Sequence, residues 1–168
     1  MIRRKPLSRQ KALERMEALC SRSEQASSEI RHKLWRLGMS AADTDAILKE
    51  LKRNRFVDDR RFAVALVNDK WEYSRWGRIK IRAKLRSLAI DSDAIDEALE
   101  SIDEKNYRCG FVALLLAKAR ASAILSDTYE NRARLMRFAA SRGFEAAMAI
   151  EIINSPKLWE RLQRDSGD

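Results

Sequence analysis

The chain has 168 residues, of which 45% are apolar and 35% are charged, and its formal net charge is +9. This composition excludes a disordered chain and leaves room for one ordinary domain or a short series of repeats. Only five Gly and two Pro interrupt the sequence, which favours long helices and leaves little turn chemistry for β-hairpins. We therefore expect an all-α protein.

No segment of the sequence indicates a membrane-spanning or secreted protein. The longest apolar stretch, residues 111–117, is far short of the roughly 20 residues that span a bilayer. No stretch near the N-terminus has the form of a secretion signal, so we expect a cytoplasmic protein with no membrane contact. Cys20 and Cys109 lie in apolar helical contexts, and we expect both to be free, buried thiols.

In chain order, the sequence predicts a basic tail, three repeats of three helices each, and a second tail. The basic tail covers 1–10, repeat 1 covers 11–56, repeat 2 covers 57–105, repeat 3 covers 106–155, and the C-terminal tail covers 156–168. The middle helices have related sequences, namely IRHKLWRLGM from Ile30, IRAKLRSLAI from Ile81 and LMRFAASRGF from Leu135. Because one triplet buries too little surface to be stable alone, we expect an elongated array of three tandem three-helix repeats.

A small residue follows the middle helix of each repeat. Gly38 in repeat 1 and Gly143 in repeat 3 stand where a left-handed backbone is commonly needed, which Gly adopts without a Cβ clash. Ala89 occupies the matching place in repeat 2. We therefore expect the turn at Ala89 to be strained.

Repeat 2 begins with Asp58 and Asp59, directly before a helix. Phe62, Ala65, Leu66, Asp69 and Tyr73 form a stripe along that helix, and Phe62, Leu66 and Tyr73 define its apolar part. A side-chain cap from Asp58 and macrodipole stabilisation from Asp59 account for the pair, at about 1 kcal/mol each. Paired carboxylates can also act as acid and base or hold a divalent metal, but adjacent residues that enter a helix point apart. We interpret the pair as structural and place Phe62 in the core.

The middle helix of repeat 2 carries a ladder of basic side chains. Its inward stripe begins with Ile81 and Leu85, which leaves arginines at four-residue spacing along another face. Such a concentration attracts polyanions or acidic protein surfaces, although a solvated face is the alternative. The candidate residues for binding a partner or DNA are Trp71, Arg75, Trp76, Arg78, Lys80, Arg82, Lys84 and Arg86.

Tryptophans flank this ladder. Trp71 falls off the predicted apolar stripe, and we expect an exposed indole of the kind found at protein hot spots and base-stacking platforms. Trp76 either shares that role or caps the end of the core between repeats. Trp35 could be part of the core of repeat 1, and we expect Trp159 to pack back on repeat 3.

The sequence contains no constellation typical of an enzyme. His32 is the only histidine, and it lacks Cys or carboxylate partners at ligand spacing. Cys20 and His32 could pair as nucleophile and base, but nothing resembles an activated-thiol signature. No Walker loop, GxGxxG, CxxC or GxSxG motif is present. We expect no catalytic residues, no cofactor and no metal site.

Several short motifs lie along the chain. They are FVDDRRFA (56–63), Gly77 with Ile81, Leu85 and Ile90, then Glu29, Ile30, Lys33, Leu34 and Gly38, and RFAASRGF (137–144). Together they resemble the RecX family of bacterial regulators of the RecA recombinase, over residues 22–153. Three residues depart from the family pattern: Ala89 replaces a usual glycine, Ala26 a frequent capping serine and Ala139 a usual leucine.

The resemblance implies a string of three-helix repeats and a non-enzymatic protein that lodges in the groove of RecA filaments on single-stranded DNA. Such a protein modulates strand exchange, ATP hydrolysis and the co-protease role of the filament in recombination, repair and the SOS response, usually by inhibition, and we expect a monomer. Asp58, Asp59, Phe62 and Gly77 would then position the basic surface. Two alternatives are a DNA-binding protein that acts through phosphate contacts without a filament partner, and a helical adaptor for an acidic protein.

Overall fold

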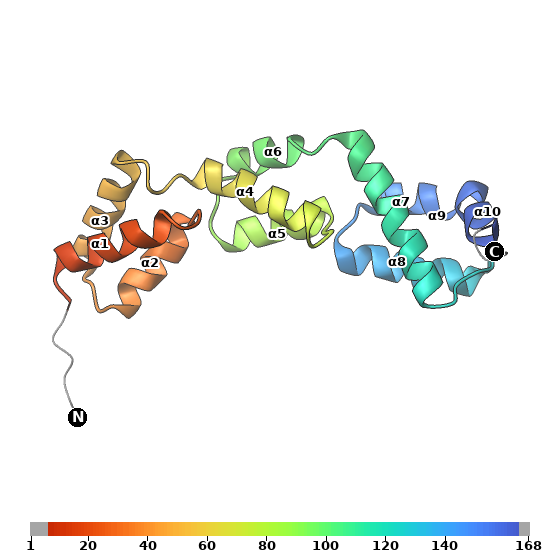
Figure 1. Ribbon diagram of the computed structural model, residues 1–168, viewed down its shortest axis with the longest axis horizontal. Helices are drawn as coiled ribbons and strands as arrows, with labels where there is room; N and C mark the ends of the chain where they lie inside the picture. The colour runs from red at the N-terminus through yellow and green to blue at the C-terminus, as the bar shows by residue number, and fades with distance from the viewer. Residues whose placement is uncertain (1–6, 165–168) are drawn as a thin grey trace, which may run out of the picture. The chain divides into compact units, whose positions relative to one another are not determined.

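The computed structural model describes residues 7–164, and the chain within that range is all-α (Figure 1). The expected fold class is therefore confirmed. The ten helices of this range are α1 (Arg9–Cys20), α2 (Ser27–Arg36), α3 (Ala41–Arg53), α4 (Asp59–Glu72), α5 (Arg78–Ser87), α6 (Ser92–Glu100), α7 (Glu104–Ala121), α8 (Tyr129–Arg142), α9 (Ala146–Ile153) and α10 (Pro156–Arg164). None of them is long and apolar enough to cross a membrane.

Capping side chains fix where several helices begin. The hydroxyl of Ser8 accepts a hydrogen bond from a first-turn amide of α1, and Ser40, Asp103 and Thr128 cap α3, α7 and α8 in the same way. Asp58 caps α4, since its Oδ1 accepts from the amides of Arg60 and Arg61 at 2.9 and 3.1 Å. Such caps satisfy amides that have no partner within the helix. The predicted role of Asp58 is confirmed.

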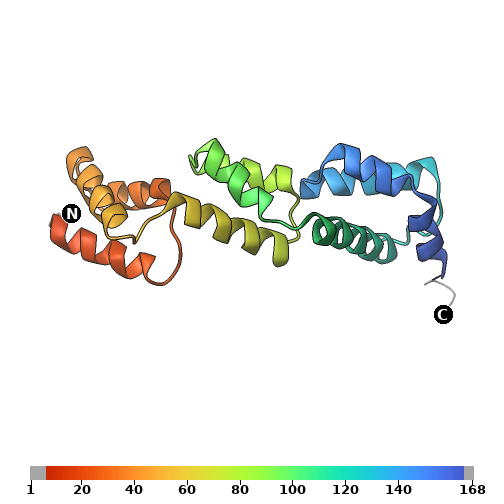
Figure 2. The same ribbon diagram turned by 90° about the horizontal axis from the view of Figure 1, so that it is seen from above.

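The chain forms two compact units. Unit 1 takes in the chain up to Leu66 together with Leu85–Ala98, and unit 2 takes in Val67–Lys84 together with the chain from Leu99 onward. In unit 1, α3 packs against both α1 and α2 (Figure 2). One apolar cluster of unit 1 consists of Ala12, Leu13, Met16, Ile30, Leu34, Ile47, Leu48, Leu51 and Val57.

In unit 2, α8 packs against α7 and α9, and α10 packs against α7 (Figure 2). The predicted C-terminal tail at 156–168 is therefore wrong in part, because α10 is a helix that buries Leu158, Trp159 and Leu162. The indole Nε1 of Trp159 donates to the carbonyl of Ile153 at 2.8 Å, which confirms the expected packing on repeat 3. At the other end, α1 begins at Arg9, and residues 1–6 of the predicted basic tail lie outside the described residues.

The turns after the middle helices have the expected backbone. Gly38 and Gly143 have φ of 80° and 83°, and Ala89 has φ of 56°. A side chain at positive φ brings its Cβ close to the neighbouring backbone. The strain predicted at Ala89 is therefore present.

The inward face of α4 differs from the predicted one. Ala63, Val67 and Trp71 are buried at four-residue intervals, while Tyr73 of the predicted stripe is 82% exposed. Phe62 is buried as expected. Trp35 is 69% exposed and so lies outside the core, and the thiol of Cys109 is exposed rather than buried.

Candidate functional site

Asp59 links the start of α4 to the start of α2 in unit 1. Its carboxylate accepts hydrogen bonds from the amide and hydroxyl of Ser27 at 2.8 and 2.6 Å, and from Nζ of Lys52 at 3.2 Å. The residue before α2 is Ala26, which has no capping side chain, so Asp59 supplies the missing acceptor. Burial alone would raise the pKa of Asp59, but the hydrogen bonds from Ser27 and the charge of Lys52 outweigh it and hold the pKa below its ordinary value.

This arrangement gives both carboxylates of the pair structural partners. Asp58 caps its own helix and Asp59 caps another. Among residues 7–164, no group of His, Cys, Asp and Glu side chains is arranged to hold a metal ion. The cap by Asp58 was predicted, whereas the link from Asp59 to α2 was not.

Trp71 does not belong to an exposed contact surface, which corrects the prediction. Its side chain is only 8% exposed and lies in unit 2 against Tyr107 and Phe144, with ring centroids 4.9 and 6.4 Å away. Gly110 makes room for it, because a Cβ at that position would lie 2.7 Å from the indole. Trp71 stabilises unit 2 by burial.

Arg78 is also bound within unit 2 rather than directed at a partner, a second correction. Its guanidinium pairs with Glu104 at 2.9 Å, donates to the carbonyl of Ile102 at 3.3 Å and lies 4.1 Å from the centre of the Tyr107 ring. Its amide donates to the hydroxyl of Tyr107 at 2.9 Å, and that hydroxyl donates to Glu145 at 2.7 Å. Burial, together with the charge of Glu145, raises the pKa of Tyr107 well above its ordinary value.

Trp76 and Lys80 form a second structural contact in unit 2. Nζ of Lys80 lies 4.6 Å from the centre of the Trp76 ring and donates to the carbonyl of Ser141 at 3.2 Å, while Lys70 approaches the same ring at 5.5 Å. The indole is partly buried. Lys80 is therefore engaged with α8 rather than free to reach a partner.

Gly77 brings two backbone segments of unit 2 into direct contact. Its amide donates to the carbonyl of Arg142 at 2.8 Å, and the amide of Ile79 donates to the carbonyl of Gly143 at 3.0 Å. A Cβ on Gly77 would lie 2.2 Å from the Gly143 oxygen. The absence of a side chain at Gly77 is what allows α5 to begin against the end of α8.

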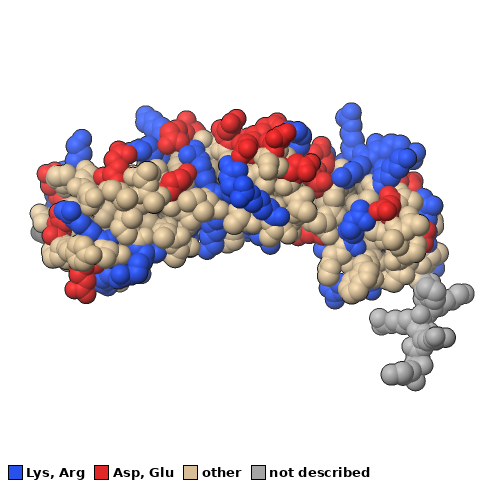
Figure 3. Space-filling view, turned by 180° about the vertical axis from the view of Figure 1, so that it is seen from behind, with Lys and Arg blue, Asp and Glu red and all other residues tan. Residues whose placement is uncertain are grey.

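The other residues that were predicted to bind a partner differ in how exposed they are. Arg75 is exposed, and its guanidinium lies 5.1 Å from the Trp71 ring. On α5, Lys84 and Arg86 are exposed and Arg82 is partly buried. We call these three residues the α5 cations; Arg82 and Arg86 are four residues apart and share one side of the helix, whereas Lys84 lies on another side. Acidic side chains gather over the neighbouring helix α6, as Figure 3 shows.

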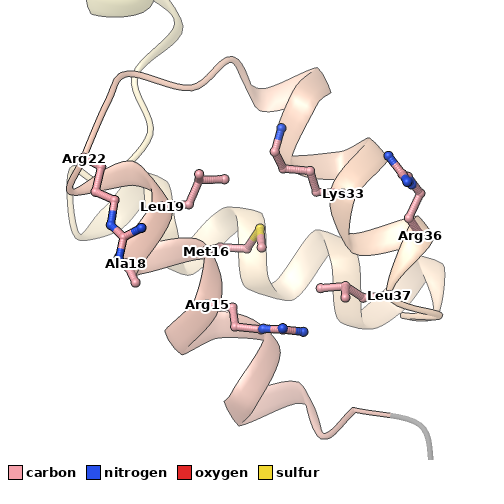
Figure 4. Close-up of a pocket in the computed structure, with 8 residues that line it drawn as sticks. All are labelled: Arg15, Met16, Ala18, Leu19, Arg22, Lys33, Arg36 and Leu37. Atoms are coloured by element: carbon pink, nitrogen blue, oxygen red, sulfur yellow. The ribbon is translucent and has the colours of Figure 1, made fainter. Parts of the chain in front are cut away.

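A groove between α1 and α2 in unit 1 was not predicted from the sequence. Its volume is about 700 Å³ (Figure 4). We call it the α1–α2 groove, and it is lined by Arg15, Met16, Ala18, Leu19, Arg22, Lys33, Arg36 and Leu37. Arg15 lies on α1, whereas Arg22 lies in the turn that follows this helix. Their spacing in the sequence therefore gives no signal of this basic rim.

Comparison with known proteins agrees with this architecture. A family model described as the second three-helix domain of RecX matches residues 58–99, which lie within predicted repeat 2. Regulatory protein RecX of Clostridium botulinum (strain Eklund 17B / Type B) is 34% identical over 115 residues, which cover 65% of this chain and 52% of that protein. The chain thus spans about half the length of this relative.

Other relatives match over more of their length. Regulatory protein RecX of Chlorobium phaeobacteroides is 29% identical over 144 residues, which cover 86% of this chain and 92% of that protein. A crystal structure of RecX from Lactobacillus salivarius superposes with a TM-score of 0.78 at 20% identity, covering 89% of this chain and 97% of that one. At this identity the superposition shows a shared fold.

Proposed function

We propose that this chain, which belongs to the RecX family, is a non-enzymatic regulator that binds in the groove of RecA filaments on single-stranded DNA. We further propose that binding inhibits the recombinase, ATPase and co-protease activities of the filament. The observation that carries the proposal is the similarity to proteins named regulatory protein RecX. In this proposal, the exposed cations Lys84 and Arg86 contact acidic groups or phosphates of the filament.

A chain built of repeats is suited to bind a filament, because a filament presents the same protomer surface many times along its length. If successive repeats of the chain each contact a RecA protomer or the enclosed strand, modest affinities sum through effective concentration. No single contact then needs to be strong. The alternative function is DNA binding through phosphates without a filament partner, which the net charge of +9 favours.

The experiment that tests the proposal compares three targets at one ionic strength: RecA filaments on single-stranded DNA, the bare strand, and free RecA. We expect the tightest binding to the filament, together with slower strand exchange and ATP turnover. Equal affinity for the bare strand would favour the alternative function. Unchanged strand exchange and ATP turnover at micromolar protein would rule out RecA regulation.

Matched charge reversals test which surface is used. Lys84→Glu with Arg86→Glu should weaken filament binding, while helical content stays unchanged because exposed substitutions usually alter stability by less than about 0.5 kcal/mol. Lys105→Glu with Lys157→Glu gives the same change in net charge at exposed positions of α7 and α10 and should bind as the unmodified chain does. Normal binding by the first variant would show that Lys84 and Arg86 do not contact the filament.

A further inference from the structure

The α1–α2 groove of unit 1 combines an apolar floor with a basic rim. Figure 4 shows Met16 and Leu19 of α1, together with Leu37 directly after α2, directed into the space between the two helices. Leu19 and Leu37 are only partly buried, so apolar surface is left accessible at the floor. A partner with apolar side chains would cover this surface.

Every charged side chain that lines the groove is basic. These side chains are Arg15 of α1, Arg22 in the turn after α1, and Lys33 and Arg36 of α2. Among the salt bridges formed within residues 7–164, none includes any of the four. The rim therefore presents positive charge that a ligand carboxylate can neutralise, which favours an acidic partner.

The groove is large enough for a ligand, and the chemistry of its floor favours a peptide over a nucleic acid. A volume of about 700 Å³ falls within the range of about 300 to 1,000 Å³ that is typical of ligand sites. The floor has no aromatic ring, whereas sites for single-stranded nucleic acid commonly stack bases on aromatic side chains. An apolar floor with a charged rim is also the arrangement by which grooves hold amphipathic segments.

We propose that the α1–α2 groove is a docking site for an acidic peptide segment of a partner protein. Large apolar side chains of the segment contact Met16, Leu19 and Leu37, and its carboxylates pair with the basic rim. This site goes beyond the proposed function, because it lies between α1 and α2 and does not depend on the α5 cations. The partner is defined by its chemistry: acidic residues that flank leucine or phenylalanine.

The test measures fluorescence anisotropy of a short fluorescein-labelled peptide in which glutamates flank leucine and phenylalanine, titrated with the full chain. We expect saturable binding that weakens at least about tenfold in Arg15→Glu with Arg36→Glu, since each reversal replaces an attraction to the carboxylates of the peptide with a repulsion. The control is Lys11→Glu with Lys49→Glu, an equal change in charge at exposed positions of α1 and α3 outside the groove. It should bind as the unmodified chain does, and circular dichroism should show both variants folded.

A second peptide separates the two parts of the site. Serine in place of leucine and phenylalanine keeps the negative charge and removes the groups that contact the floor, so it should bind more weakly than the first peptide. Four results would overturn the proposal: no saturable binding to the unmodified chain, equal binding by the two charge-reversed variants, displacement of the peptide by a single-stranded oligonucleotide that itself requires Arg15 and Arg36, or self-association of the chain through the same residues.

Discussion

Gly77 is the residue whose lack of a side chain matters most to the contacts of unit 2. The atoms that a Cβ would meet belong to the backbone at Gly143 and Phe144, at 2.2 to 2.5 Å. Backbone atoms held by hydrogen bonds from Gly77 and Ile79 cannot move aside without loss of those bonds. The position therefore tolerates only glycine, and the cost of a methyl group there can be measured.

We predict that Gly77→Ala lowers the free energy of unfolding by at least about 3 kcal/mol, because overpacking against fixed backbone adds to the loss of two hydrogen bonds. Urea denaturation followed by circular dichroism would measure it. The control is Ala83→Gly, at an exposed position of α5, the helix that follows Gly77. It should lower the free energy of unfolding by about 1 kcal/mol, because glycine has a low helix propensity. A similar cost for both exchanges would show that unit 2 relaxes around the methyl group.

Asp59 gives a prediction about pH. Asp59→Ala removes the acceptor for the first amide of α2, and loss of a helix cap costs about 1 to 2 kcal/mol at neutral pH. The folded-state pKa of Asp59 lies below its ordinary value, so this stabilisation is present above about pH 3.9, the unfolded value, and is lost as pH falls through the lower folded value. The difference between the two proteins in urea unfolding should therefore shrink in acid.

Ser27 provides the internal check on this explanation. Ser27→Ala removes the hydroxyl that donates to Asp59 and keeps the amide that also donates. The pKa of Asp59, followed by carboxyl chemical shifts in a pH titration, should move back toward its ordinary value. If the pKa did not change, the hydroxyl would not contribute to the shift.

Among the elements, the end of α5 carries strain that a single substitution can remove. Ala89 has φ of 56°, and an L-residue in this region costs roughly 1 to 2 kcal/mol relative to glycine. We predict that Ala89→Gly raises the free energy of unfolding by about 1 kcal/mol, after the entropic cost of a more flexible unfolded chain. The measurement is the urea midpoint at an unchanged m-value.

The reciprocal exchange at the end of α2 tests the same cause. Gly38 has φ of 80°, and a Cβ there would meet nothing within 4 Å, so any cost of Gly38→Ala comes from the backbone conformation alone. We expect a loss of about 1 kcal/mol. If Ala89→Gly were neutral while Gly38→Ala were costly, packing around Ala89 would be compensating its strain.

Helix starts and ends could be predicted because their causes are local. Asp58 caps the amides two and three residues ahead, and glycine or alanine marks the turn after each middle helix. The buried face of α4 depends on residues distant in sequence, so it could not be predicted. Trp71 packs beside Gly110 and Tyr107, whereas local periodicity gave more weight to Tyr73, which is exposed.

The same limit explains the predicted basic ladder. Spacing along α5 identifies which arginines share a helical face, but it does not show that Glu104 and Tyr107 of α7 hold Arg78. It also does not show that Lys80 reaches the end of α8. Fewer cations on α5 are therefore exposed than the sequence predicts. The α1–α2 groove could not be predicted either, because it depends on how two helices are placed relative to each other.

For the whole molecule, the net charge of +9 makes the salt dependence of binding a way to identify what the exposed cations contact. If Lys84 and Arg86 neutralise phosphates, the log–log dependence of affinity for bare single-stranded DNA on salt has a slope of about 0.7 per phosphate contacted. Removing both should then lower that slope by roughly 1.4. We predict instead that Lys84→Glu with Arg86→Glu leaves the slope for bare DNA nearly unchanged and weakens binding to the RecA filament. That outcome would assign these side chains to acidic groups of the protein component, whereas a lower slope on bare DNA would assign them to the strand.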